Sequence, residues 1–465
     1  MRAQFLSLCA LGASLINASP VGLDCYDESS FKPEDIIHRD VFIVGGGATG
    51  VYAAVSLRDR NKTVAVVERA DRLGGHVDTF RAAAAGDAPI DYGVQAYIKN
   101  NQTLNFFQRF GVQLNASGLS PFPSKVVDFK SGFVVPNATA VDPNTLVGPL
   151  ANYLFATLQF DFLAQGAYDI PENVPEDLLL PFGQFVDKHN LTDVVQVVWM
   201  FAQGVGNLLE TPTLYVLQNF GQPHLLGLSS GYLYAPGGNQ QVYDRAGAFL
   251  GSDVLYSSVV VASKRTDEGV TAVVASATGR KLVKAKKLLI TIPPTVKNLA
   301  PFDLDDSETS VFKQWQNVPY YVGVVSKTGL PDLTNYLNVD VTAPDALPQT
   351  PFVWRLETVG VPGYQTVKVI GEPDSVKAQG LVTDAARKIG ASTNGTSTAG
   401  VDFNAWKEHS DLQLHVSPDA VKAGFYRDLY ALQGKRSTYY TGNAWCSDYS
   451  PLLWAFTESR VLPNL

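Results

Sequence analysis

The pattern of apolar and polar positions is most informative near the start of the chain, where four elements follow one another. An apolar, β-prone run at 41–44 leads into the glycine-rich segment 45–50. Apolar side chains at helical spacing continue over 49–59, and a second, almost wholly apolar run at 63–67 ends at Glu68. Strands buried on both faces are continuous apolar runs, whereas helices carry one apolar stripe. The pattern therefore predicts a strand, a tight turn, a helix and a buried strand.

The glycine spacing of this unit suits the close approach of a pyrophosphate. Gly45 permits a tight turn out of the strand, Gly47 leaves the backbone bare, and Gly50 lets the helix pack closely on the strand. The helix is expected over 49–59, and the free N–H groups and partial positive charge at its start, beside Ala48 and Thr49, favour phosphate. The unit is therefore predicted to bind a dinucleotide.

Glu68 ends the second strand, where its carboxylate is placed to accept hydrogen bonds from ribose hydroxyls and to repel a 2′-phosphate. Such a unit alone fits NAD or FAD. The chain continues through Arg69 to a second glycine pair, Gly74 and Gly75, followed by His76. This continuation resembles the two-part FAD fingerprint of the flavin amine oxidase superfamily and related glutathione-reductase-like oxidoreductases. The resemblance implies FAD as the cofactor, with the glycine pair near its pyrophosphate and flavin.

His76 departs from that superfamily, which commonly has Arg at this position. As a hydrogen-bond donor, His76 could contact a phosphate or the flavin edge. The alternative is a loop histidine with a structural hydrogen bond. FAD binding remains the expectation, but amine oxidation becomes less favoured.

A second block of cofactor-domain character begins at a proline-glycine turn, 236–241. A short helix, a strand at 254–263, a hairpin and a buried strand at 287–292 follow. This succession resembles the second FAD segment of the same superfamily. In that segment, a strand matching 258–261 places its backbone on the adenine. The resemblance nominates Val260 for this contact, and the alternative is an ordinary core strand.

A third block lies at the end of the sequence. A strand beginning at Thr438 runs into a turn at Gly442 and Asn443, and a helix is expected at 450–461. The superfamily ends in the same way, with the turn touching the flavin and its ribityl chain. The resemblance therefore implies cofactor contacts from Gly442 and Asn443. Three blocks in the expected order are more specific than any single motif.

These blocks predict an α/β fold: a glutathione-reductase-like Rossmann FAD-binding domain built from discontinuous segments, plus an α+β substrate domain. In the regions between the blocks, helices are expected at 103–110, 144–165, 178–190, 194–203, 212–220, 374–388 and 419–432, and strands at 122–137, 318–327 and 367–370. The predicted division is a signal peptide at 1–18, an FAD-binding domain at 40–95, 231–299 and 433–465, and a substrate domain at 96–230 and 300–432.

Composition narrows the class of protein. The chain has 465 residues, of which 46% are hydrophobic and 17% charged, which suits two compact domains and argues against disorder. The formal net charge is −8 and no basic stripe occurs, so nucleic acid is not expected as a partner. The six histidines show no metal-binding spacing, so no metal site is expected. No run after the N-terminus approaches the length of a membrane span.

The N-terminus predicts entry into the secretory pathway. Arg2 precedes a largely apolar stretch at 5–16, and Ala18 is a small residue suited to cleavage. The alternative is a buried N-terminal helix. Cys25 and Cys446 could pair or remain separate thiols, and we favour the absence of a disulfide framework. Asn-x-Ser/Thr sequons fit a glycosylated, secreted or lumenal protein, and they begin at Asn61, Asn101, Asn115, Asn137, Asn190 and Asn394.

A flavin performs the redox step itself, so the protein has to bind, orient and exclude water. Many amine oxidases have a lysine that holds a water against N5 of the flavin, on the strand that 318–327 matches, and this chain has Tyr320 and Tyr321 there. Trp454 belongs to an aromatic cluster near the expected flavin end, where rings can stack a planar substrate. Tyr320, Tyr321 and Trp454 are therefore the candidate catalytic residues, with aromatic core packing as the alternative for the tryptophan.

The run 74–79, the strand 320–323 and the tail 441–463 together resemble the fungal β-cyclopiazonate dehydrogenase-like family of secreted FAD oxidoreductases. The resemblance implies dehydrogenation or oxidative cyclisation of a bulky aromatic or terpenoid secondary-metabolite intermediate. A hydride would pass to flavin N5, and O2 or another acceptor would take the electrons. The first alternative is a flavin amine or amino-acid oxidase that releases hydrogen peroxide. An NAD-linked oxidoreductase and an inactive binding protein are further alternatives, and the intact glycine set disfavours the latter.

Overall fold

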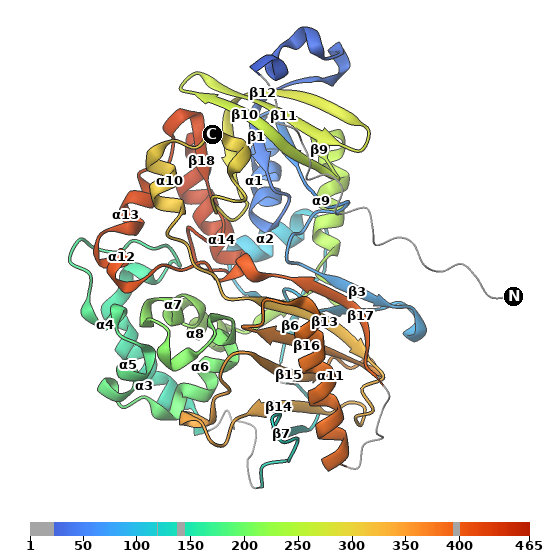
Figure 1. The fold of residues 1–465 in the computed structure, drawn as a ribbon, viewed down its shortest axis with the longest axis vertical. Coiled ribbons are helices and arrows are strands. Elements are labelled where there is room, and N and C mark those ends of the chain that lie inside the picture. Colours follow the sequence, from blue (N-terminus) through green and yellow to red (C-terminus); the bar gives the residue numbers. More distant parts are fainter. Residues whose placement is uncertain (1–22, 119, 137–144, 394–399) are drawn as a thin grey trace, which may run out of the picture.

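The computed structural model describes residues 23–118, 120–136, 145–393 and 400–465. The expected signal peptide at 1–18 and the sequons at Asn137 and Asn394 lie outside these described residues. Two large sheets organise the described chain, one toward the top of Figure 1 and one toward the bottom.

The first sheet has seven strands, and its centre is parallel. β1 (Ile36–Val44) lies between β12 (Gly279–Ile290) and β2 (Val64–Val67) and is parallel to both. The second half of β1 and all of β2 are buried, which explains their continuous apolar sequences. The other strands are β9 (Val254–Leu255) beside β2, β18 (Thr438–Tyr440) beside β12, and the antiparallel strands β10 (Ser258–Thr266) and β11 (Gly269–Ser276).

Helices from three distant parts of the chain pack beside the first sheet. α1 (Ala48–Asp59) connects β1 to β2 and completes the expected βαβ unit. α9 (Gln241–Leu250) and α14 (Ser450–Phe456) both pack against α1 (Figure 1). Stretches that are far apart in the sequence thus build one layered unit.

The second sheet is mixed, with six strands in the order β17-β13-β16-β15-β14-β7. α11 (Ser375–Ser392) packs on one of its faces, where side chains of the helix and the sheet form a separate hydrophobic cluster. The opposite face joins the main core. The strands are β7 (Ser124–Asp128), β13 (Tyr320–Ser326), β14 (Asn335–Val339), β15 (Phe352–Thr358), β16 (Tyr364–Ile370) and β17 (Asp402–Glu408).

The remaining elements are short. Most of the helices between α2 and α8 gather beside the second sheet (Figure 1). The helices are α2 (Asn101–Arg109), α3 (Val147–Thr157), α4 (Glu176–Leu179), α5 (Phe182–His189), α6 (Val195–Ala202), α7 (Thr213–Asn219), α8 (Gln222–Ser230), α10 (Asp306–Phe312), α12 (Pro418–Lys422) and α13 (Phe425–Tyr430). Two small sheets contain β3 (Thr79–Ala82) with β4 (Ala88–Asp91), and β5 (Tyr97–Ile98) and β6 (Asn115–Ser117) on either side of β8 (Tyr232–Tyr234).

Several expected elements are divided in the structure. The strand expected at 254–263 is two strands, because Ser257 adopts a φ of +47° and interrupts the extended backbone. The helix expected at 178–190 is divided at Pro181, which lacks an N–H and forces an extended conformation on the residue before it. α12 and α13, expected as one helix, separate at Gly424, whose φ is +94°.

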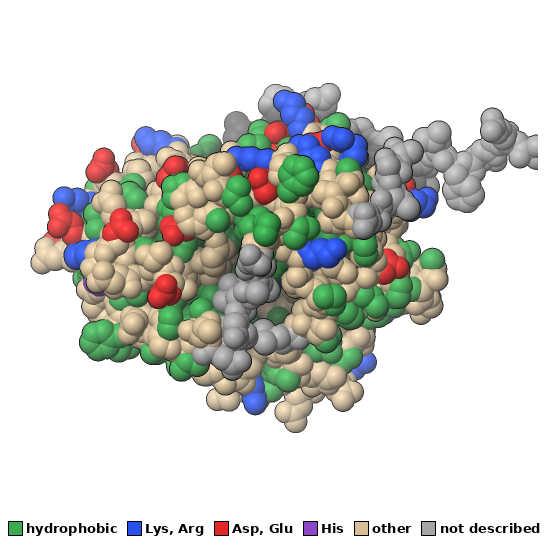
Figure 2. Space-filling model, turned by 90° about the horizontal axis from the view of Figure 1, so that it is seen from below, with side chains coloured by type: hydrophobic (Ala, Val, Ile, Leu, Met, Phe, Trp, Pro, Cys, Tyr) green, Lys and Arg blue, Asp and Glu red, His purple; other side chains and the backbone are tan. Residues whose placement is uncertain are grey.

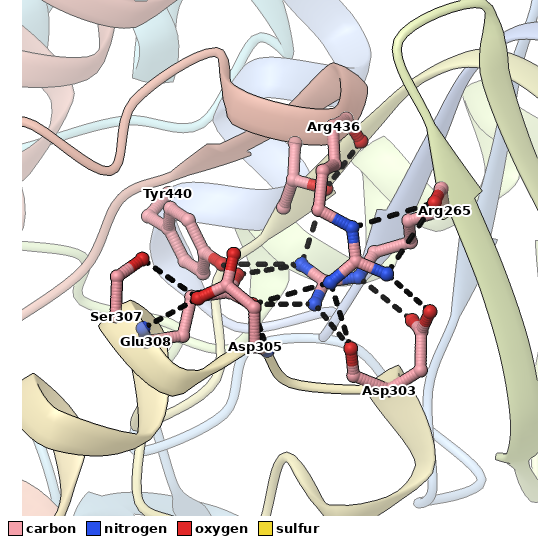
Figure 3. A network of polar contacts seen from close by, with 8 residues as sticks. Arg265, Asp303, Asp305, Ser307, Glu308, Arg436 and Tyr440 are labelled. Carbon is pink, nitrogen blue, oxygen red and sulfur yellow. Dashed lines mark hydrogen bonds and ion pairs between the residues drawn. The ribbon is translucent and has the colours of Figure 1, made fainter.

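A buried ionic network holds the third cofactor block, at β18, against the second, at β10 (Figure 3). The Arg265 side chain on β10 is fully buried and donates to Glu308 of α10 at 2.7 Å and to Asp303 at 3.1 Å. Arg436 also pairs with Asp303, and the Tyr440 hydroxyl on β18 donates to Glu308. The network therefore joins β10, α10 and β18.

The cysteines, the helix lengths and the surface charges can be compared with the expectations from composition. Cys25 and Cys446 are both free thiols, as favoured from the sequence. In the part of the chain that the structure describes, no helix has the length and apolar character needed to cross a bilayer. Across the face in Figure 2, Lys and Arg side chains lie in scattered groups and do not form one continuous stripe.

Candidate functional site

The turn between β1 and α1 lies against the second glycine pair. The Gly74 N–H donates to the Gly46 carbonyl at 2.8 Å, and Gly47 and Gly74 form an isolated parallel bridge. A Cβ placed on Gly75 would lie 2.9 Å from the Cα of Gly47, and the φ of Gly75 is +57°. Both facts favour glycine. The two glycine motifs thus form one closely packed surface of bare backbone.

Gly45 and Gly50 shape the turn itself. Gly45 has a φ of +105°, and a Cβ on Gly50 would collide with the Gly45 carbonyl oxygen. Thr291, which follows β12, donates through its hydroxyl to the carbonyls of Val44 at 3.0 Å and Gly45 at 3.1 Å. These contacts fix the turn where the first strand ends.

The N-terminus of α1 is open toward this surface. Its N-cap is Gly47, which has no side chain to cap the helix, and its first turn contains no acidic residue. The N–H groups that begin at Ala48 and Thr49 therefore have no carboxylate or hydroxyl of the cap in competition for them. Such a helix start attracts a phosphate.

Glu68 is buried at the end of β2, close to the same turn. Its carboxylate accepts the N–H of Gly46 and the N–H of Ala70, each at 2.7 Å. Each oxygen keeps a further lone pair for a ribose hydroxyl. Arg69, the next residue, is exposed beside it.

His76 stacks on His409, which follows β17 in the second sheet, with ring centroids 4.1 Å apart. His409 Nε2 lies 3.2 Å from Asp78, which also pairs with Lys407 at 2.9 Å and with Arg72. Burial and the neighbouring His409 lower the pKa of His76 well below its usual range, so its ring is neutral. His76 thus lies beside the second glycine pair, at a junction between the two sheets.

Asp78 is the charged centre of this junction. Burial alone would raise its pKa, but a hydrogen bond from His409 and the charges of Arg72 and Lys407 outweigh burial and lower the pKa to about 2. Sequence reasoning missed the Asp78–His409 contact, because its partners are 331 residues apart. The one available signal for this contact was the presence of an acid, Asp78, in the run 74–79.

The third block meets the first at Thr291. Gly442 has a φ of +118°, and a Cβ there would lie 3.3 Å from the Thr291 carbonyl oxygen. Asn443 donates both of its amide hydrogens, to the carbonyls of Asp411 at 2.9 Å and Leu412 at 2.8 Å. The side-chain oxygen of Asn443 therefore remains for a cofactor contact. Val260 lies on β10 with a buried side chain, as the core alternative also requires.

Tyr320 and Tyr321 point to opposite faces of the second sheet, as neighbours on a strand do. Tyr320 belongs to the main core, and its hydroxyl lies 3.4 Å from the Gln203 amide nitrogen. Tyr321 belongs to the cluster under α11, stacks on Trp406 and donates to the Pro373 carbonyl at 2.9 Å. The structure therefore does not bring Tyr321 to the candidate site.

Trp454 is also placed away from a substrate. It is fully buried on α14, and its indole N–H donates to the Ala48 carbonyl at 3.1 Å. Its ring stacks on Tyr52 of α1, with centroids 5.6 Å apart. This placement agrees with the alternative of aromatic core packing, in which Trp454 supports the start of α1.

A pocket lies beside the turn that carries Asn443, and we call it the Asp448 pocket. It reaches from this turn to α7 and to the loop at 412–415. Sequence reasoning missed Asp448, although a single acid in the aromatic segment after Gly442 was a signal. The lining residues are Tyr168, Val205, Thr211, Pro212, Tyr215, Gln218, Asn219, Leu412, Gln413, Leu414, His415, Asn443, Ser447 and Asp448.

The geometry defines a class of protein. The bare glycine surface, the uncapped start of α1 and Glu68 form a cradle for the adenosine and pyrophosphate of a dinucleotide, and the turn at 442–443 continues it toward a pocket. The described residues contain no cluster that could hold a metal ion. These residues fit FAD, and the site is that of an FAD-dependent oxidoreductase.

The chain belongs to the flavin-containing amine oxidoreductase family, whose model matches residues 48–450. It is 40% identical over 428 residues to the β-cyclopiazonate dehydrogenase of Aspergillus oryzae, covering 91% of this chain and 92% of the relative. It is 34% identical to the FAD-dependent oxidoreductase pigF of Monascus ruber over 97% of this chain and 98% of the relative. The fold matches that of a CLA-producing fatty acid isomerase from P. acnes, with a TM-score of 0.72 and 19% identity, over 91% of this chain and 98% of the other.

Proposed function

We propose that the protein dehydrogenates or oxidatively cyclises a bulky secondary-metabolite intermediate. The observation that carries this proposal is the 40% identity to a β-cyclopiazonate dehydrogenase over 91% of the chain. The presence of a pocket directly beside the cofactor turn at Asn443 supports a small-molecule substrate.

The residues of the chain divide the work between binding and orientation. When bound, FAD would supply the two-electron oxidation of the substrate. The glycine cradle and Glu68 hold the adenosine half, and His76 lies where it can donate to the cofactor. Asn443 anchors residues 411–412, which follow the second sheet, to the turn at 442–443, so this wall of the pocket keeps its position relative to that turn.

Anaerobic reduction of the bound flavin tests this proposal. The purified, FAD-loaded protein is mixed without oxygen with candidate indole or terpenoid precursors, and with simple monoamines, polyamines and amino acids. We expect loss of the flavin absorbance with a member of the first group only. Bleaching by simple amines, with hydrogen peroxide release in air, would instead establish an amine or amino-acid oxidase.

We also propose that the protein passes through the secretory pathway. Support comes from the exposure of every sequon asparagine that the structure describes, because an oligosaccharide needs an accessible side chain. Protein purified from a eukaryotic secretory host should lose mass on glycosidase treatment, and an unchanged mass would contradict glycosylation. The exposed residues are Asn61, Asn101, Asn115 and Asn190.

A further inference from the structure

Asp448 is an acid without a partner in a largely enclosed place. It is half-buried and lines the pocket beside Asn443. Within the described chain, its carboxyl has neither a hydrogen bond nor an ion pair, whereas the nearby Asp169 pairs with Arg460 at 2.7 Å. A carboxylate removed from water costs free energy unless another group compensates it.

No side chain of the pocket supplies that compensation. The described lining residues include no lysine and no arginine. Burial lowers the pKa of His415, which leaves that imidazole neutral. Burial raises the pKa of Tyr168 and of Tyr320, both of which lie within electrostatic range of Asp448, so both phenols are neutral.

The remaining titratable neighbours follow the same rule. Burial raises the pKa of Tyr449 and of the Cys446 thiol, so neither carries charge near neutral pH. Burial likewise raises the pKa of Asp448 itself. The pocket therefore contains one acid, neutral polar groups and no positive charge.

We propose that the Asp448 pocket is a subsite for a positively charged nitrogen of the substrate, with Asp448 as its counter-ion. A bound ammonium would provide the positive charge that the lining lacks, and neutral oxygens such as those of Gln218 and Asn219 would accept its other hydrogens.

An ammonium paired with a carboxylate has no free lone pair to support its own oxidation, so the nitrogen held here is remote from the bond that is oxidised. The inference rests on the proposed function and narrows its substrate class to bulky intermediates that carry a basic nitrogen. Asp448 acts in recognition and not in the chemical step.

Matched pairs of probes test the subsite by binding alone. Tryptamine and tryptophol differ in an ammonium against a hydroxyl, and phenethylamine and phenethyl alcohol repeat the comparison. Binding to the FAD-loaded protein is measured by titration calorimetry. A charge-assisted contact in a desolvated site should favour each amine about tenfold over its alcohol. If neither amine binds better than its alcohol, the proposal is overturned.

The variant Asp448→Asn keeps the shape of the side chain and removes its charge. We expect its amine-to-alcohol affinity ratio to fall close to 1, with the affinity for the alcohols little changed. Asp169→Asn is the matched control, because it removes a nearby carboxyl that does not line the pocket, and it should keep the wild-type ratio. Retention of the wild-type ratio by Asp448→Asn would overturn the assignment of the counter-ion.

The pH dependence offers an independent measurement. A cation binds to the ionised form of Asp448, so the affinity for the amines should rise with pH as this carboxyl ionises, and the alcohols should show no such rise. The binding measurements and the flavin-reduction test of the proposed function can fail independently. If a precursor reduces the flavin but the amines bind no better than their alcohols, only the subsite proposal is wrong. If the amines bind better but no precursor reduces the flavin, only the proposed function is wrong.

Discussion

Gly75 shows how one residue decides whether a cofactor fits. Its φ of +57° costs an alanine about 1–2 kcal/mol, and its Cβ would also lie 2.9 Å from the Gly47 backbone. The substitution Gly75→Ala should therefore displace the glycine turn and reduce bound FAD, measured as the ratio of visible to ultraviolet absorbance after purification.

The control for this substitution is Gly86→Ala. Gly86 has a similar φ of +67°, but nothing lies within 4 Å of its added Cβ. It shares the backbone cost without the collision, so its FAD content should equal that of the wild type. Equal flavin losses in the two variants would show that backbone strain, and not the close approach, is responsible.

The neighbours Tyr320 and Tyr321 form a second matched pair. Tyr320→Phe removes a hydroxyl from the core that adjoins the pocket, whereas Tyr321→Phe removes one beneath α11. We expect about a fivefold change in kcat/KM for Tyr320→Phe, the size of one hydrogen bond, and little change for Tyr321→Phe. Steady-state kinetics with a precursor that bleaches the flavin makes the comparison, and equal effects would contradict it.

At this scale, the sequence predicts residues whose role is local. Gly45, Gly47 and Gly50 act within six positions of one another, so their spacing revealed the turn. Asp78 and Asp448 take their roles from distant partners, or from the lack of a partner, which no local pattern records. Adjacent tyrosines could be assigned to opposite faces of a strand, but which face meets the pocket depends on the packing of α11.

Whole elements depend on buried polar contacts as well as on apolar faces. Arg265→Met would remove the fully buried cation that Glu308 and Asp303 share in the network of Figure 3, and would leave beside them only the more exposed Arg436. We expect the free energy of unfolding to fall by about 3–5 kcal/mol, as it does when one partner of a buried pair is removed. Chemical denaturation measures this change.

The exposed pair Arg387–Asp384 on α11 provides the comparison. Arg387→Met removes a charge of the same kind from a solvent-exposed position, where an ion pair contributes little. Its stability should stay close to that of the wild type. A similar loss in both variants would mean that burial does not set the strength of the Arg265 network.

Element boundaries followed from the sequence at the start of α1 but not at every residue that interrupts a helix or a strand. The start of α1 was placed within one residue, because a bare glycine turn precedes it. The breaks at Pro181 and Ser257 were missed for different reasons. Pro181 carries a clear local signal that was overlooked, whereas Ser257 has a positive φ between β9 and β10, which pair with different strands, and no local motif marks it.

On the scale of the whole molecule, Asp78 links the cofactor segment to the second sheet. Its folded pKa of about 2 lies below the value near 3.9 of an unfolded Asp. Its contribution to stability, about 2 kcal/mol, is therefore complete above the unfolded pKa and is lost as the pH falls through about 2.

The difference in unfolding free energy between the wild type and Asp78→Asn should consequently narrow as the pH is lowered from about 5 to about 3. Urea denaturation at several pH values provides the measurement. The comparison cancels the titration of groups that do not interact with Asp78, whereas the loss of its charge lowers the pKa of both His76 and His409. A difference that stays constant over this range would show that the junction does not depend on the charge of Asp78.

The two-domain arrangement could be predicted because the three cofactor blocks carry their own glycine turns. The contacts between the domains could not, since they are made by single side chains such as His409 and Asn443 in stretches without a motif.

The strand order of the first sheet also has a consequence for how the protein is made. β1 and β2 leave the ribosome early, yet the other neighbour of β1 is β12, and β18 comes close to the end of synthesis. At ~5–20 residues per second, one edge of β1 stays unpaired for roughly ten to fifty seconds, a period in which an apolar strand edge is open to aggregation. We therefore expect the nascent chain to need protection from aggregation during this interval, and a chain truncated before residue 438 would contain the whole glycine fingerprint but lack β18 and the turn at 442–443.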